Sequence, residues 1–151
     1  MRRTIIIAGI GAMLAAAPVS AQTGARPLRP EADSEAIQAA AAVIKITELR
    51  RQGNATVKLF GTAAGDPAMN GLYTYIAFWQ STGDGWRVFK IGDFLDYALV
   101  SEAPGRVVLQ LRESTMDRAT GNIGARTRRI AVAWTPVADG APATVRVTAA
   151  P

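Results

Sequence analysis

Two residue types that carry much of enzyme chemistry are missing from this sequence. Its 151 residues include no histidine and no cysteine. Histidine is the side chain that most often acts as a general base near neutral pH, and it is the commonest metal ligand. Catalytic Ser-His and Cys-His pairs, His-ligated zinc and disulfide bonds are therefore excluded. The sequence predicts no cofactor and no bound metal.

The catalytic groups that remain are carboxylates and serines near lysines. Two carboxylates can hydrolyse a glycosidic bond at the right separation, but Asp93 and Asp96 are typical of turn residues that point to opposite faces. A Ser-Lys hydrolase needs a serine beside a lysine, and nothing in the sequence brings such a pair together. The residues concerned are Ser81, Ser101, Ser114, Lys58 and Lys90. We therefore expect no enzymatic activity, and a carboxylate- or Ser/Lys-dependent hydrolase is the third choice among the functions below.

Residues 72–80 are apolar on both faces of a predicted strand. Alternate side chains of a strand project to opposite sides, so Leu72, Ile76 and Phe78 lie opposite a second set that contains tyrosine and tryptophan. Tyr and Trp rings combine an apolar body with a polar tip, which suits an apolar or amphipathic ligand. The predicted ligand-binding residues are Tyr73, Tyr75, Trp79 and, across a predicted hairpin, Trp86. The alternative is that these rings pack in the core beneath an N-terminal helix.

Arginines gather at the start of a later predicted strand, at Arg126, Arg128 and Arg129. Arg106 and Arg112 lie on the strand before it. Together these side chains predict a patch for phosphate, anionic lipid or nucleic acid. The alternative is a solvated strand edge, where charge prevents aggregation between edges.

The first 21 residues have the pattern of a cleavable export signal. Arg2 and Arg3 precede an uncharged, mainly apolar run of 13 residues, which is too short to span a bilayer. The small side chains before Gln22 predict cleavage between Ala21 and Gln22. The paired arginines leave twin-arginine export open beside ordinary secretion. We expect a periplasmic or secreted bacterial protein with no membrane anchor in its mature chain.

The charge of the mature chain is modest. The formal net charge is +5, and without Arg2 and Arg3 the chain has 15 basic and 12 acidic side chains. An excess this small suits solubility and weak attraction to anionic surfaces, and it argues against nucleic acid as the partner. Arginine outnumbers lysine by 14 to 3 and alanine is abundant, a composition typical of GC-rich bacterial genomes.

The elements that must position these residues begin after an extended leader at 22–32. Asp33 and Ser34 are candidate N-caps, and the polar residues that follow share one sector of a helix. We predict a helix from about 34 to 52, ended by Gly53. The alternative for its second half is a strand, because residues 43–47 are mostly β-branched and the Gln-Gly-Asn sequence behind them suits a hairpin.

From residue 54 onward the sequence alternates in the manner of β-strands. The predicted strands cover 55–61, 73–81, 86–91, 94–102, 106–115, 127–135 and 143–149. Short turns without helical crossovers favour a meander. We predict an α+β, mainly β, single domain over 33–149. Its N-terminal helix covers one face, or plugs the mouth, of a six- to seven-stranded antiparallel meander that forms a curved sheet or an open barrel.

These observations favour an exported, non-enzymatic module that binds an apolar or amphipathic ligand or an envelope partner. The second choice is a structural or interaction protein whose Arg-rich face docks onto an envelope complex, anionic lipid or cell-wall polymer. The sequence leaves the oligomeric state and the identity of the ligand open.

Overall fold

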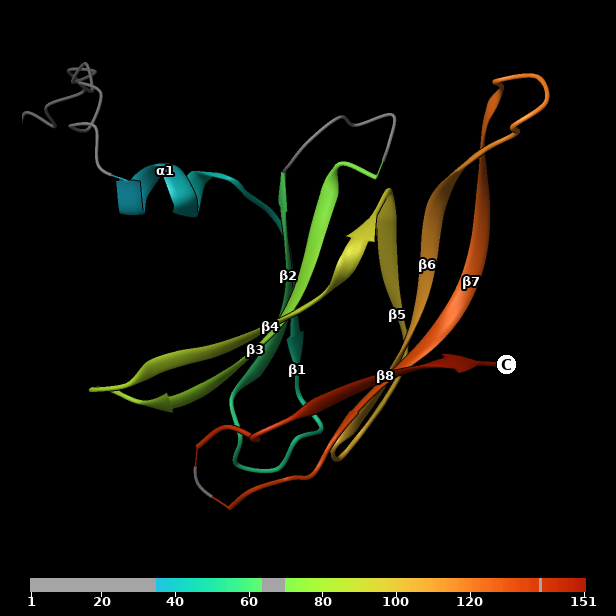
Figure 1. The fold of residues 1–151 in the computed structure, drawn as a ribbon. Helices are drawn as coiled ribbons and strands as arrows, with labels where there is room; N and C mark the ends of the chain where they lie inside the picture. The colour runs from blue at the N-terminus through green and yellow to red at the C-terminus, as the bar shows by residue number, and fades with distance from the viewer. Residues whose placement is uncertain (1–34, 64–69, 139) are drawn as a thin grey trace, which may run out of the picture. The chain divides into compact units, whose positions relative to one another are not determined.

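The computed structural model describes residues 35–63, 70–138 and 140–151, which form one short helix and eight strands (Figure 1). The predicted export signal and leader, at 1–21 and 22–32, lie outside the described residues. The elements are α1 (Glu35–Ala41), β1 (Val43–Leu49), β2 (Val57–Ala63), β3 (Leu72–Ser81), β4 (Gly85–Phe94), β5 (Asp96–Ala103), β6 (Arg106–Met116), β7 (Ile123–Trp134) and β8 (Val145–Ala150).

The strands form two four-stranded antiparallel sheets, in which each strand pairs with the next along the chain. The first sheet has the order β1-β2-β3-β4 and the second has the order β5-β6-β7-β8 (Figure 1). The predicted antiparallel meander is confirmed in this sense, but the expected single sheet or open barrel of six or seven strands is not. Only Leu95 separates the two sheets, and its backbone N–H donates to the Arg112 carbonyl at 2.8 Å. The alternation of residues predicts where the strands lie, but it does not predict that the chain passes from one sheet to the other at Leu95.

The helix prediction is wrong over its second half. The helix α1 ends at Ala41, and residues 43–49 form β1, as the alternative interpretation of that segment proposed. β-branched side chains pack well on a pleated surface, and β1 gains a full ladder with β2, in which Ile46 lies opposite Phe60. Gly53, expected to end the helix, has a φ of 64° in the β1–β2 connection. The seven residues of α1 include no buried side chain, so the helix does not cover the sheet as predicted.

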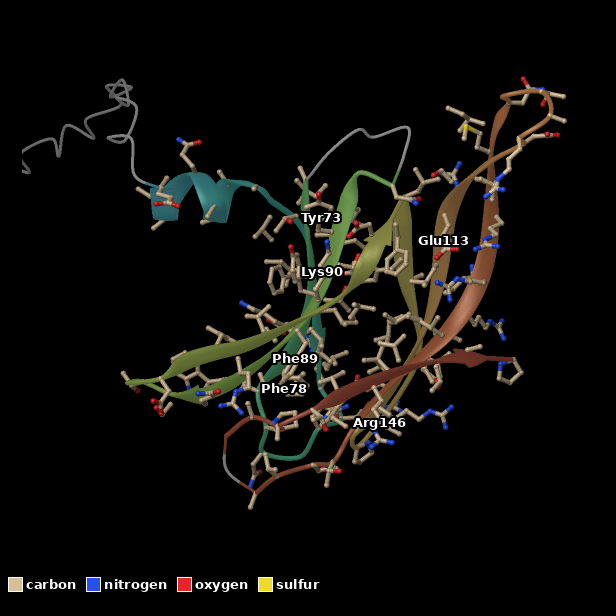
Figure 2. All side chains as sticks on the ribbon, in the orientation of Figure 1. Tyr73, Phe78, Phe89, Lys90, Glu113 and Arg146 are labelled. Atoms are coloured by element: carbon tan, nitrogen blue, oxygen red, sulfur yellow. The ribbon has the colours of Figure 1, made fainter. Side chains whose placement is uncertain are left out.

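One core lies between the inner faces of the two sheets. The fully buried side chains come from both, with Leu59, Ile76 and Phe78 from the first sheet and Leu109 and Val132 from the second. Burying a side chain of this size stabilises the fold by roughly 1.5–3 kcal/mol. The ring of Phe78 contacts Phe89 beside it, as Figure 2 shows, and Trp134 of the second sheet at a centroid distance of 5.1 Å. Along β6, the buried side chains of Val107, Leu109 and Leu111 face this core and alternate with more exposed residues.

The turns at one end of the sheets are joined by Gln52. Its side-chain amide donates to Glu102 Oε1 at 2.9 Å and to the Ala103 carbonyl at 3.0 Å, while its Oε1 accepts from Gly105 N at 3.0 Å. Gly105 has a φ of 72°, and a Cβ at this position would lie 2.7 Å from the Trp134 carbonyl oxygen. Only glycine fits there. The contacts of Gln52 hold the β1–β2 and β5–β6 turns together at this end of the core.

Candidate ligand-binding face

The four aromatic residues predicted to bind a ligand lie on the outer face of the first sheet. Along β3, buried core residues alternate with this set, in which Tyr73 and Tyr75 are half-buried and Trp79 is 37% exposed. Trp86 of β4 lies opposite Trp79, and their rings meet edge to face at 5.4 Å. None of the four is buried in the core. The face is therefore available for binding, and the alternative of core packing beneath the helix does not describe these rings.

Two adjoining hollows lie along the same outer face. The first has a volume of about 340 Å³ and an almost entirely apolar lining, and the second, of about 630 Å³, has a more polar lining. Ile46, Lys58 and Trp86 line both hollows, which therefore adjoin one another at these three side chains. We call the two hollows together the outer groove. Ligand sites in proteins commonly measure 300–1,000 Å³ and combine apolar walls with a few polar groups. The first hollow is lined by Ala40, Val43, Ile46, Lys58, Phe60, Ala77, Trp86 and Val88.

Only one of the four predicted aromatic residues lines the outer groove. Trp86 does so, whereas Tyr75 supports it indirectly by stacking on Phe60 at 5.0 Å with an angle of 17° between the rings. Sequence reasoning missed Ile46 because its segment was assigned to a helix. It also missed Phe60, although Lys58 and Phe60 alternate with the buried residues of β2 and so could have been assigned to the outer face.

All three lysines of the chain lie over aromatic rings. Lys45 Nζ is 4.4 Å from the Tyr97 ring centre, Lys58 Nζ is 4.1 Å from that of Trp86, and Lys90 Nζ is 3.9 Å from that of Tyr73. Figure 2 shows Lys90 beside Tyr73. Attraction between a cation and the face of a ring contributes about 0.5–1 kcal/mol at exposed sites. The aromatic residues of the first sheet thus also hold positive charge.

The acidic residues considered for hydrolysis are engaged in ion pairs. Asp96 Oδ1 lies 2.6 Å from Lys45 Nζ, and Asp93 Oδ1 lies 2.8 Å from Lys90 Nζ. The hydrogen bond from Lys90 to Asp93 raises the pKa of that lysine. Partial burial acts to raise the pKa of Asp96, and the hydrogen bonds from Lys45 and the Tyr97 backbone outweigh it, so the pKa is lowered. The first ion pair joins β1 to β5, and the second links two residues of β4.

The candidate Ser-Lys pairs are likewise not assembled. The Ser81 hydroxyl lies 2.7 Å from Asp84 Oδ2 and accepts from the Asp84 backbone N–H, which fixes the β3–β4 turn predicted from the sequence. Within residues 35–63, 70–138 and 140–151, no hydrogen bond joins a lysine to Ser81, Ser101 or Ser114. The geometry of these side chains offers no activated serine.

The structure separates the three predicted anion-binding arginines into two environments. Arg126 and Arg128 lie on the inner face of the β6–β7 hairpin, and both bind the carboxylate of Glu113. The distances are 3.1 Å from Arg126 Nε to Glu113 Oε2 and 2.7 Å from Arg128 Nη2 to Glu113 Oε1. Figure 2 shows Glu113 on this hairpin. The side chain of Glu113 is 10% exposed, and the hydrogen bonds from Arg128, followed by those from Arg126, lower its pKa.

Arg129 lies on the opposite face of the same hairpin. It is paired in register with Gln110, whose neighbours along β6 place Arg106 and Arg112 on that outer face. Arg146 of β8 joins them, because it and Arg106 are both register partners of Ala133 (Figure 2). None of these four arginines has an Asp or Glu carboxylate within 4.0 Å among the described residues, and Arg129 Nη1 donates to the backbone oxygen of Pro151 at 3.4 Å. The outer face of the second sheet is therefore basic. Of the three predicted anion-binding residues it holds Arg129, whereas Arg126 and Arg128 lie on the opposite face.

No family model, no curated protein and no solved structure matches this chain. In the described part of the chain, no three acidic side chains are grouped so that they could hold a metal ion. The helix found there is too short to cross a membrane. Function is therefore inferred from the two outer faces themselves.

Proposed function

We propose that this protein is an exported, non-enzymatic binding module whose outer groove takes up the apolar part of an amphipathic ligand. The observation that carries the proposal is the pair of adjoining hollows that Ile46, Lys58 and Trp86 line on the side of the first sheet away from the core. Because the core is complete between the sheets, packing of the domain does not account for an apolar lining on this face. Export of the chain is part of the proposal and follows from the pattern of residues 1–21 alone.

The exposure of the groove residues supports this proposal. Ile46 is 60% exposed, Val88 is 47% exposed and Trp86 is 37% exposed. Exposed apolar side chains that occur singly are ordinary on a protein surface, whereas a contiguous set often marks a binding site. A bound alkyl chain would remove these side chains from water, with a gain of roughly 25 cal/mol for each Å² of apolar surface buried.

The experiment is a fluorescence titration with decyl maltoside, an uncharged amphiphile, below its micelle concentration. Trp86 lines the groove, whereas Trp79 touches Trp86 and does not line it. We expect saturable quenching or a blue shift in the wild-type protein and in Trp79→Leu, and weaker binding in Trp86→Leu. An absence of saturable binding by the wild-type protein, or equal weakening in both variants, contradicts the proposal.

A second candidate function follows from the charge of the β6–β7 hairpin. Residues 112–129 contain five arginines and two acidic residues, whereas the remainder of 35–151 contains eight basic and eight acidic residues. Beyond Arg112 and Arg129 the two strands pair only with each other. Near the turn, Met116 and Ile123 are register partners that are 58% and 56% exposed. An apolar end flanked by arginines favours docking to an anionic lipid surface.

This candidate is tested by sedimentation with vesicles. We expect binding to vesicles that contain phosphatidylglycerol and no binding to pure phosphatidylcholine, and we expect binding to weaken at raised ionic strength because exposed charges are screened. The informative variants are Met116→Ser with Ile123→Ser, and Arg112→Gln with Arg129→Gln, since none of these residues binds Glu113. Sedimentation that is the same in these variants as in wild type counts against the candidate.

A further inference from the structure

We infer that the ligand of the outer groove is a single-chain amphiphile with an anionic head group, and that Lys58 binds this head. The inference rests on the function proposed above and adds to it the chemical class of the ligand. Two observations support it: the ammonium of Lys58 binds no carboxylate among the described residues, and Lys58 lines both hollows of the groove.

The three lysines provide an internal comparison. Each lies over an aromatic ring, and two of them also bind a carboxylate, Lys45 that of Asp96 and Lys90 that of Asp93. Lys58 has no carboxylate within 4.0 Å among the described residues, and its ammonium donates no hydrogen bond to them. An ammonium group carries three donors. In Lys58 these donors are left for water or for a ligand.

The surroundings of Lys58 make these unused hydrogen-bond donors unusual. The residue is half-buried, and its ammonium lies 4.1 Å from the ring centre of Trp86 and 5.9 Å from that of Phe60. Glu48 is its register partner on β1, yet the Glu48 carboxylate lies 3.5 Å from Arg50 and not within ion-pair distance of Lys58. A cation beside apolar walls interacts more strongly with an anion than a cation in bulk water does.

The position of Lys58 matches the two parts of an amphiphile. It lines the smaller hollow, whose other side chains are those of alanine, valine, isoleucine, phenylalanine and tryptophan. It also lines the larger hollow, where Arg50, Asn54 and Thr56 supply polar groups. An alkyl chain in the smaller hollow would therefore present its head to Lys58 at the boundary. Carboxylate and phosphate heads share the oxygen acceptors that an ammonium binds.

The experiment compares ligands that share one alkyl chain, namely decanoate, decyl phosphate, decyl maltoside and decyltrimethylammonium, each titrated below its micelle concentration. We expect the two anions to bind the wild-type protein about tenfold more tightly than the uncharged ligand, as one charge-assisted hydrogen bond provides. The cation is expected to bind most weakly. The comparison of decanoate with decyl phosphate distinguishes a fatty acid from a phosphorylated lipid as the source of the head.

Three variants separate the role of Lys58 from a general loss of positive charge. Lys58→Gln is expected to remove the preference for anions, so that decanoate and decyl phosphate bind this variant no more tightly than decyl maltoside binds it. Lys90→Gln is the matched control, because Lys90 also lies over a ring but is paired and does not line the groove. We expect it to keep the preference. Glu48→Gln removes a negative charge from the groove and is expected to raise the affinity for anions a few-fold.

The outcomes distinguish this inference from the proposed function. If decyl maltoside binds and the anions bind no more tightly, or if Lys58→Gln weakens all ligands equally, the head-group assignment is overturned and the groove remains a binding site. If none of the four ligands binds the wild-type protein, both the proposed function and this inference fail.

Discussion

The outer groove and the β6–β7 hairpin hold positive charge in different ways. In the groove, the ammonium of Lys58 lies over two aromatic rings and binds no carboxylate among the described residues. On the inner face of the hairpin, Arg126 and Arg128 converge on the single carboxylate of Glu113. Rings attract a cation without using its hydrogen-bond donors, whereas a carboxylate uses them. The donors of the groove cation are therefore not used by the described residues, whereas the inner face of the hairpin uses its cations to hold two strands together.

The difference follows from which face of a sheet each residue occupies. Glu113 is on the inner face of β6, two residues beyond the core residue Leu111, so its carboxylate is largely removed from water. A carboxylate in that position must be paired, because an unpaired buried charge is costly. Lys58 is on the outer face of β2, where water can solvate its ammonium. The first arrangement contributes to stability, and the second leaves the ammonium open to water.

The largest effect is expected from Glu113→Gln. The amide keeps the shape of the side chain, but it loses the charge and most of the acceptor capacity that Arg126 and Arg128 use. We expect the free energy of unfolding to fall by about 2–3 kcal/mol, as for the loss of hydrogen bonds to a charged group. Urea denaturation measures this change, with Arg112→Gln as the control on the outer face of the same strand. A loss below that of the control shows that the pair contributes no stability.

The pH dependence of stability provides a smaller effect from the same carboxylate. The arginines lower the pKa of Glu113 below its ordinary value near 4.5 in the folded protein. Its contribution is therefore fully present above pH 4.5 and is lost as the pH falls through the lowered folded pKa. We expect the wild-type protein to lose more stability than Glu113→Gln in acid. Three other carboxylates with a lowered pKa make the free energy of unfolding depend on pH in both proteins, namely Asp96, Glu102 and Asp117. The measurement is the melting temperature of both proteins as a function of pH below 4.5. If it falls equally in the two proteins, the assignment of this pH dependence to Glu113 is wrong.

The two arginines of the hairpin are expected to contribute unequally. Arg128 contacts both carboxylate oxygens of Glu113 through Nε and Nη2 and is 44% exposed, whereas Arg126 contacts one oxygen through Nε and is 65% exposed. We expect Arg128→Met to cost about 1.5 kcal/mol and Arg126→Met to cost less than about 1 kcal/mol, as for an exposed pair. Equal losses, measured by urea denaturation, would show that the bidentate geometry makes no difference.

The sequence allowed most of the fold to be predicted and much less of the site. Seven of the eight strands were predicted, most of them because polar and apolar residues alternate along them, and β3 because β-branched and aromatic residues run between turn signals. The eighth, β1, was assigned to a helix because the polar positions of residues 35–52 also fit one helical sector. Only pairing with β2 decides between the two periods, and pairing is a contact between distant segments. The change of sheet at Leu95 is equally invisible to a local pattern.

The candidate sites were also predicted only in part, because they too depend on pairing between distant segments. Trp79 and Trp86 were assigned to one face correctly because a short turn fixes their register. Ile46 and Lys58, by contrast, come to the groove from strands that the alternation of β3 says nothing about. For the arginines, strand parity already places Arg126 and Arg128 on one face and Arg129 on the other, and treating the three as one patch overlooked it. The pairing of Arg126 and Arg128 with Glu113 depends on the register of β6 with β7.

The smallest effect is expected from Lys58→Met, which makes in the groove the change that Arg128→Met makes in the hairpin. Methionine replaces the aliphatic stem, and its sulfur can contact Trp86, a gain of about 0.3–1.5 kcal/mol that offsets the lost attraction between cation and ring. Because Lys58 binds no carboxylate among the described residues, its loss leaves no buried charge unpaired. We therefore expect the free energy of unfolding to change by less than about 0.5 kcal/mol. The measurement is urea denaturation of the two methionine variants side by side. If Lys58→Met lowers the free energy of unfolding as much as Arg128→Met does, Lys58 has a structural role like that of the hairpin arginines. Its ammonium would then not be free to bind a ligand.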